Sequence, residues 1–459
     1  MILGPSDVLF ALSKPKFRLA LAALILLSLS GCSHIVTIAK CDDPRASIWQ
    51  YVTLVALPYE YIGTNDNLTG AAKNLAFINQ LQIVSSGLDY DNFGITTLVR
   101  AADSDTSCDP VEVEKKLFDP EREYSGPAMY RDYNDLIIWW GRIYEQSDSV
   151  YIQNNLRFVQ HGQNPQLRHV KKVDGAEFTF VGSLPGRGLS FSPREVSPKI
   201  LSQLRDIIET SGKVYHDHDR GSTVVHTLVP EELGVLELKK GGANRAPDGW
   251  VQIDVSGKKG WWQIGEYREE VKELFSELYF LDGTIGVLQY FHPQLSVGRM
   301  KIVENVERAF KDFAQRNGEP SQRSEVALGK LLTGYVQLAR GEELRSDVWL
   351  TEAARMLEEA VVSMPSNSKV RTLRAMPSVI RCCTPDDGGV TREVAEEALL
   401  NAIIVDPTDE TAFRNLEVFY KYLAALKHYE AKDLSAIQEF LRAFQRANQP
   451  KKVDQEVEP

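Results

Sequence analysis

The sequence predicts an α+β multidomain protein with an N-terminal α/β sandwich, a β-rich middle domain and a C-terminal all-α domain of helical hairpins. Strand and helix patterns alternate through residues 48–160, and short strands bounded by turn residues prevail in the middle of the chain. Helical periodicity then dominates residues 297–448. Because 459 residues exceed what one hydrophobic core usually fills, several domains are expected.

The composition excludes one class of partner. The chain has 52 Lys and Arg against 63 Asp and Glu, a net charge of −11, and its basic runs are short. Affinity for nucleic acid comes largely from cations that neutralise phosphates. We therefore expect no nucleic-acid partner.

The first segment, residues 1–31, has the order of a secretory signal peptide. Lys14, Lys16 and Arg18 precede an apolar run that ends at Leu29. This run is roughly half the length of about 20 residues that a membrane-spanning helix needs. We expect it to be a targeting segment and not a folded element.

The residues that end this segment, Leu29-Ser30-Gly31-Cys32, resemble the lipobox of bacterial lipoproteins. The resemblance implies cleavage before Cys32, a diacylglycerol thioether on its sulfur and an acylated amine. Since each buried methylene adds about 0.8 kcal/mol, three acyl chains would anchor the chain firmly in a membrane. By the family's sorting rule, Ser33 favours the outer membrane. The alternative is an uncleaved helix or a free core thiol.

The other cysteines suggest disulfide bonds, because an even number in an oxidising compartment favours pairing. Cys41 and Cys108 flank the first predicted domain and form the preferred pair. Cys382 and Cys383 are adjacent. They are reduced, joined in a vicinal disulfide, or one of them is paired elsewhere.

Residues 32–47 are predicted to be a tether, and residues 48–160 an α/β domain. Its expected elements are a β-rich run, a helix, a strand, a second helix and a hairpin, at residues 49–61, 68–84, 94–99, 109–118 and 135–159. In the second strand of the hairpin, alternation predicts one buried and one wet face. The buried face holds Val150, Ile152, Leu156 and Phe158, and the wet face holds Tyr151, Gln153, Asn155 and Arg157.

Residues 160–172 are interpreted as a polar break, and residues 172–296 as a mixed middle domain with a β-rich part at 223–264. Within it, Gly249-Trp250 and Gly260-Trp261 flank a glycine turn. This pattern resembles a bacterial SH3-like barrel repeat, which implies peptidoglycan as a partner. The alternative is an ordinary antiparallel hairpin with aromatic cross-strand pairs.

Two segments of the predicted helical domain, residues 297–448, share one spacing. Small residues at such offsets let two helices approach closely, and a proline ends the helix. The matching positions are Ala353, Leu357, Ala360 and Pro365, and then Ala395, Leu399, Ala402 and Pro407. They resemble the second helix of a tetratricopeptide repeat, although the repeat exceeds the usual period of about 34 residues. The alternative is an unrelated helical bundle, and residues 449–459 are predicted to be a disordered tail.

Catalytic signatures are absent from the sequence. It contains no phosphate-binding glycine motif and no GxSxG turn, so we expect no enzyme and no cofactor. One polar cluster is a candidate metal site: His216 and His218 share a face of an extended chain, and His226 lies in the next predicted strand. The alternative is a solvated connection between strands.

The hypothesis that best fits these patterns is a lipid-anchored scaffold on the periplasmic face of the outer membrane. Its partners would be other envelope proteins or peptides, bound through helical repeats. The rival hypothesis is a metal-dependent envelope hydrolase that uses His216, His218 and His226. A purely structural component of an envelope assembly is a third possibility that the sequence does not separate from the first.

Overall fold

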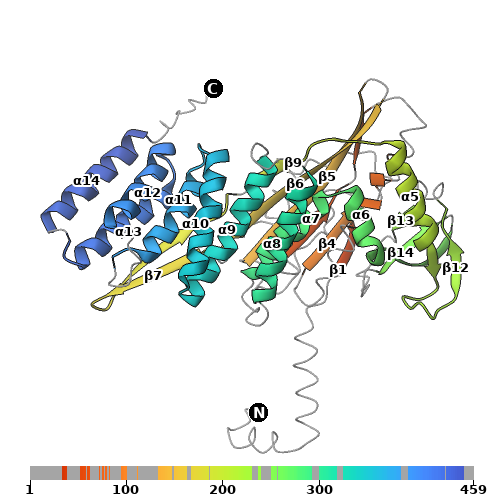
Figure 1. Cartoon of the computed structure of the whole chain (residues 1–459), viewed down its shortest axis with the longest axis horizontal. Coiled ribbons are helices and arrows are strands. Elements are labelled where there is room, and N and C mark those ends of the chain that lie inside the picture. Colours follow the sequence, from red (N-terminus) through yellow and green to blue (C-terminus); the bar gives the residue numbers. More distant parts are fainter. Residues whose placement is uncertain are drawn as a thin grey trace, which may run out of the picture. The chain divides into compact units, whose positions relative to one another are not determined.

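The structure is a computed structural model (Figure 1). It describes residues 34–38, 52–57, 59–62, 95–100, 133–146, 149–162, 167–185, 187–229, 236–238, 250–255, 257–291, 299–317, 324–383, 391–428 and 431–448, with isolated positions 72, 75, 76, 78, 79, 82 and 111.

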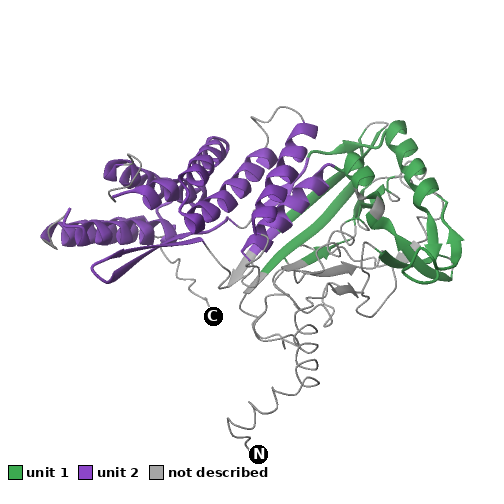
Figure 2. Cartoon of the chain, turned by 60° about the horizontal axis from the view of Figure 1, so that its bottom comes forward, with its two compact units in different colours: residues 1–157, 192–275 green, residues 158–191, 276–459 purple. Residues whose placement is uncertain are grey.

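The chain divides into two compact units (Figure 2). The first comprises residues 1–157 and 192–275, and the second comprises residues 158–191 and 276–459. The chain therefore passes between the units at residues 157, 191 and 275, whereas we expected domain boundaries near 160 and 296. Residues 158–191 join the second unit because a hairpin from the middle of the chain packs among the C-terminal helices, and the last boundary is earlier because a helix at Glu277–Tyr290 packs against the helices that follow it.

A mixed sheet forms the centre of the first unit. Its strands follow the order β1-β4-β2-β5-β6-β10, and β3 pairs with β5. β1, β4, β2 and β5 are mutually parallel along this order, as an α/β arrangement requires. The bounds are β1 His34–Ile38, β2 Val52–Ala56, β3 Glu60–Ile62, β4 Ile95–Arg100, β5 Tyr133–Gln146, β6 Ser149–Gly162 and β10 Arg194–Glu195.

Apolar runs in β2 and β5 fill the core of this unit. Leu54, Val55, Leu136 and Ile137 are fully buried on successive positions, which is typical of parallel strands covered on both faces. The predicted helix near residue 75 is confirmed at the positions that the structure describes, where Ala72, Leu75 and Ile78 are helical and buried.

Two predictions for residues 32–160 are wrong. Within the predicted tether, His34–Ile38 forms β1, which pairs with β4. On the predicted wet face of β6, Asn155 is only 5% exposed, although Tyr151, Gln153 and Arg157 are half-buried. The opposite face is buried as predicted, at Val150, Ile152, Leu156 and Phe158.

A second, antiparallel sheet in the first unit follows the order β12-β11-β15-β14-β13. Its strands are β11 Lys213–Tyr215, β12 Val224–Thr227, β13 Leu236–Leu238, β14 Trp250–Val255 and β15 Lys258–Gln263. Helix α5, Pro198–Ser211, is capped by Ser197 and lies close to η5, Ile264–Tyr267, and α6, Arg268–Leu274. Trp262 is buried and its indole nitrogen donates to the Ser211 carbonyl at 2.8 Å. The SH3-like resemblance stays a prediction.

The polar break expected at residues 160–172 is wrong. Strand β6 continues to Gly162, and Leu167–Val173 forms β7, which pairs with β8, Ala176–Gly182, in a two-stranded hairpin. The buried amine of Lys171 donates to the carbonyls of Ile380 and Cys382 at 3.1 and 2.8 Å. Because two carbonyls accept hydrogen bonds from its ammonium group, Lys171 can be buried, although a hydropathy pattern predicts that a lysine is exposed to solvent.

Helices make up the rest of the second unit, and they begin before the expected residue 297. α7 is buried on almost every side, so its sequence carries no amphipathic period. The bounds are α7 Glu277–Tyr290, α8 Arg299–Arg316, α9 Ser324–Leu344, α10 Asp347–Ser363, α11 Ser368–Arg381, α12 Arg392–Val405, α13 Glu410–Ala425 and α14 Ala431–Asn448. The short strand β9, Arg187–Ser190, also belongs to this unit.

The C-terminal helices pack as successive hairpins, α9 with α10, α11 with α12 and α13 with α14. Helix α11 also contacts both α9 and α13. The predicted packing residues are fully buried on α10 and α12, namely Ala353, Leu357, Ala360, Ala395, Leu399 and Ala402. Pro365 and Pro407 follow the ends of these helices, as expected. The tetratricopeptide resemblance itself stays a prediction.

Side chains of α13 and α9 form hydrogen bonds with the backbone of the β7–β8 hairpin. Asn415 is fully buried, its amide nitrogen donates to the Val181 carbonyl at 2.6 Å, and its amide oxygen accepts from the Val181 N–H at 2.9 Å. On α9, the Tyr335 hydroxyl accepts from the Leu167 N–H at 3.2 Å. The hairpin therefore packs with the helices, because helical side chains form hydrogen bonds with its backbone N–H and C=O groups.

We predict that Asn415→Leu lowers the free energy of unfolding by about 1–3 kcal/mol, because the substitution leaves buried backbone groups of Val181 without partners. Urea denaturation of the two proteins measures this difference. Hydrogen exchange at the Val181 amide should also become faster. Asn448→Leu, at an exposed position on α14, is the matched control and should change neither quantity. Equal stability of Asn415→Leu and the parent would contradict the prediction.

Candidate functional site

The predicted lipid site and the preferred disulfide lie outside the described residues. This applies to Cys32 with its lipobox, Leu29, Ser30 and Gly31, and to Cys41 and Cys108. The structure therefore leaves these predictions as they stood.

The two adjacent cysteines follow α11 and are joined to each other. Cys382 and Cys383 form a vicinal disulfide, which is one of the three arrangements considered from the sequence. Cys382 is buried, and its carbonyl accepts the hydrogen bond from Lys171. The pair thus lies where the last turn of α11 meets the β7–β8 hairpin.

The histidines of the candidate metal site have separate neighbours. His216 lies beside the Asp217 carboxylate at 3.0 Å, and the ring of His218 packs against the indole of Trp261 with centroids 5.3 Å apart. Nδ1 of His226 lies 3.5 Å from the ammonium of Lys258, so this ring nitrogen already has a neighbour other than a metal. Among the described residues, no three His, Cys, Asp or Glu side chains come together in a way that could hold a metal ion.

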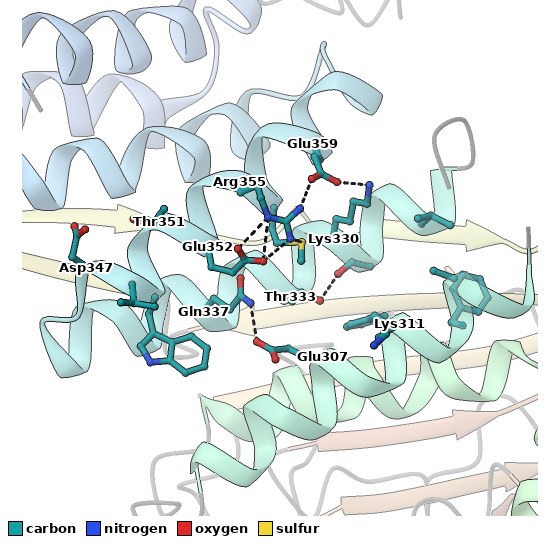
Figure 3. A pocket seen from close by; sticks show the side chains of 18 residues that line it. Glu307, Lys311, Lys330, Thr333, Gln337, Asp347, Thr351, Glu352, Arg355 and Glu359 are labelled. Atoms are coloured by element: carbon teal, nitrogen blue, oxygen red, sulfur yellow. Dashed lines mark hydrogen bonds and ion pairs between the residues drawn. The ribbon is translucent and has the colours of Figure 1, made fainter. Parts of the chain in front are cut away.

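A groove between α8, α9 and α10, within the second unit, is the strongest candidate site (Figure 3). Its volume is about 900 Å³, which lies within the range of ligand pockets. By surface area the lining is mostly apolar, and it includes Phe310, Phe313, Val326, Val348, Trp349 and Met356. Polar or charged side chains stand around this apolar surface at ten of the 18 lining positions.

Glycines on α9 let neighbouring helices approach closely, and one of them, Gly329, lines the groove. A Cβ atom at Gly341 would lie 3.0 Å from the backbone nitrogen of Leu350, so the missing side chain lets α10 approach closely. A Cβ atom at Gly329, which lines the groove, would lie 3.1 Å from the Phe310 ring. Because Gly329 has no side chain, the space between α9 and the Phe310 ring at this point is not filled.

Charged residues on one side of the groove form a network. The guanidinium of Arg355 binds Glu352, with Nε 3.1 Å from Oε2, and also Glu359, which in turn pairs with Lys330. Hydrogen bonds from Lys330 to Glu359, and from Arg355 to Glu352, hold the pKa of each carboxyl below its usual value. The network keeps these side chains extended along the wall of the groove (Figure 3).

Two polar side chains are buried in the groove. Gln337 is 2% exposed and its Nε2 donates to Oε1 of Glu307 at 2.7 Å, whereas its own oxygen has no hydrogen-bond partner among the described residues. The hydroxyl of Thr333, one turn before it, donates to the Gly329 carbonyl at 2.9 Å and keeps acceptor capacity. The oxygen of Gln337 is therefore an acceptor in the lining of the groove that has no partner among the described residues.

The sequence predictions missed this groove, because it depends on how three helices meet. The only signal in the sequence was the set of glycines on a long helical segment, which indicates close helix packing but not where the packing leaves space.

Comparison with known proteins gives no relative for this chain: no family model, no curated protein and no solved structure matches it. In the part of the chain that the structure describes, none of the helices combines the length and the hydropathy required to cross a bilayer.

We predict that the Arg355 network makes stability depend on pH. Because the folded pKa values of Glu352 and Glu359 are lowered, their contribution is present above about pH 4.5 and is lost as the pH falls through the folded values. Arg355→Met should therefore lower the free energy of unfolding at pH 7 by about 0.2–1 kcal/mol, as expected for solvent-screened pairs. The difference should become smaller as the pH falls below about 4.5.

Urea denaturation of both proteins from pH 7 to pH 3 checks this expectation. Arg308→Met, on an exposed position of α8, is the control and should give no pH-dependent difference. A deficit in Arg355→Met that is as large at pH 3 as at pH 7 would show that packing, not charge, accounts for the role of Arg355.

Proposed function

We propose that this protein is a lipid-anchored scaffold of the bacterial envelope, which binds segments of other envelope proteins in the groove between α8, α9 and α10. The observation that carries the proposal is the groove itself, an apolar hollow of about 900 Å³ with a few buried polar groups. Such sites are typical of ligand and peptide recognition between helices. The tetratricopeptide resemblance supports the same interpretation.

The location in the proposal depends on the lipobox resemblance at Cys32. Acyl chains on this residue would confine the protein to a membrane, and Ser33 favours the outer membrane with the protein on the periplasmic face. Confinement raises the effective concentration of membrane-associated partners, so a groove of modest affinity suffices for a scaffold. Peptidoglycan enters only through the SH3-like resemblance at residues 249–261.

The hydrolase hypothesis gains no support from the structure. Its three histidines do not form a common set of ligands, and His226 lies beside an ammonium group. The scaffold remains the function that the described geometry supports best.

We predict that Ala314→Trp abolishes partner binding, because Ala314 lines the groove on α8 and an indole there would fill it. The measurement is chemical crosslinking in envelopes of the producing bacterium, followed by identification of the crosslinked proteins. Gln315→Trp places the same ring on the next, exposed residue of α8 and should keep the parent's crosslinks. If both variants keep the same crosslinks, the groove does not bind the partners.

We predict that Cys32→Ser abolishes lipid attachment. Cells labelled with an alkyne analogue of palmitate should incorporate it into the parent chain and not into the variant, and the variant should leave the membrane fraction. Cys108→Ser controls for the loss of a cysteine elsewhere. A labelled Cys32→Ser chain, or an unmodified thiol at position 32 of the parent, would refute the proposed anchor.

A further inference from the structure

We propose that the groove binds a peptide segment in which an apolar side chain is followed or preceded by Lys or Arg, with the cation held by Glu307 and Gln337. This inference rests on the proposed function and adds the chemistry of the bound partner. Its evidence is the one acidic group lining the groove that has no cation among the described residues, together with the buried acceptor beside it.

Three of the four acidic side chains that line the groove already have a cation. Asp347 binds Arg381 with Oδ1 2.6 Å from Nε, and Glu352 and Glu359 share Arg355. Glu307 differs, because among the described residues its only hydrogen bond comes from the neutral amide of Gln337. A half-buried carboxylate of this kind is stabilised by any cation that reaches it.

The amide of Gln337 has one possible orientation. The carboxylate of Glu307 can only accept hydrogen bonds, so Nε2 of Gln337 must face it and Oε1 must point elsewhere. This oxygen is buried without a partner in the described structure, which costs about 1–3 kcal/mol. A donor on the bound segment that reaches this oxygen removes that cost. An ammonium or guanidinium group carries several donors, so a single cation has enough for both the Glu307 carboxylate and Gln337.

The nearby ammonium group of Lys311 does not argue against a cationic side chain at Glu307 and Gln337. Lys311 follows Glu307 by one turn of α8 and is exposed, and the two form no ion pair in the described structure. A solvated ammonium is a weak site for an anionic partner, whereas the pair of acceptors at Glu307 and Gln337 is partly withdrawn from water. The apolar lining around them selects a partner that presents a large apolar side chain next to its cation.

The test uses the full-length chain in detergent and a phage-displayed library of random dodecapeptides. Selected peptides are then made synthetically with a fluorophore, and their dissociation constants are measured by fluorescence anisotropy. We expect the selected peptides to share Lys or Arg beside an aromatic or aliphatic residue. Replacing that Lys by norleucine, or Arg by citrulline, should weaken binding about tenfold, equivalent to about 1.4 kcal/mol.

The variant Glu307→Gln separates the charge from the fold, because a glutamine there can still accept the hydrogen bond from Gln337. We expect the cationic peptide and its neutral analogue to bind this variant with nearly equal affinity. Glu304→Gln removes the same charge from an exposed position of α8 and should keep the tenfold preference. Gln337→Met should weaken the cationic peptide more than the neutral one, with circular dichroism to verify folding.

The outcomes distinguish the inference from the proposed function. If peptides bind and Ala314→Trp blocks them, but they lack the cation or bind Glu307→Gln with the same preference, the inference is wrong and the peptide-binding groove stands. Enrichment of Asp or Glu would likewise overturn it and point to Lys311. If no selected peptide is sensitive to Ala314→Trp, both the inference and the binding role of the groove are refuted.

Discussion

The architecture of the second unit depends on the buried side chain of Asn415, which forms the two backbone hydrogen bonds that a neighbouring strand would otherwise form with Val181. Asn415 gives Val181 both a donor and an acceptor, so an edge of the β7–β8 hairpin ends against a helix and not in water. An unpaired strand edge exposes a row of N–H and C=O groups, which folded proteins cover or interrupt. Aromatic contacts reinforce the arrangement, with Phe180 packed edge-to-face on Phe419 and Phe178 on Tyr422. A segment far earlier in the sequence thereby becomes part of a helical array.

Much of the fold could be predicted from local patterns. Period-two alternation placed the buried face of β6, and the spacing of Ala353, Leu357 and Ala360 marked the face of α10 that packs against its neighbours. Two elements could not be found in this way. β7 has a basic sequence whose buried Lys171 is satisfied by carbonyls of α11 and its cap, and α7 is buried on nearly all sides, so neither has the contrast between two faces on which such predictions rely.

The groove could not be predicted from the sequence, because it depends on how separate helices pack against one another. Its floor depends on Gly329 being opposite Phe310, and its wall on the approach of α10 to α9 at Gly341, which are relations between helices. The histidine cluster shows the converse error. His216, His218 and His226 are close in the sequence and were predicted as candidate metal ligands, yet His218 packs on Trp261 and His226 lies beside Lys258. Proximity along the chain is therefore poor evidence for a shared site.

Strand β1 has a consequence for the proposed anchor, since it starts at His34 and only Ser33 separates it from Cys32. Two extended residues span at most about 7 Å. A lipidated Cys32 would then hold this border strand of the central sheet, and with it the first unit, directly at the headgroup layer with almost no slack. Such a short connection would restrict rotation of that unit relative to the membrane far more than a long flexible linker would.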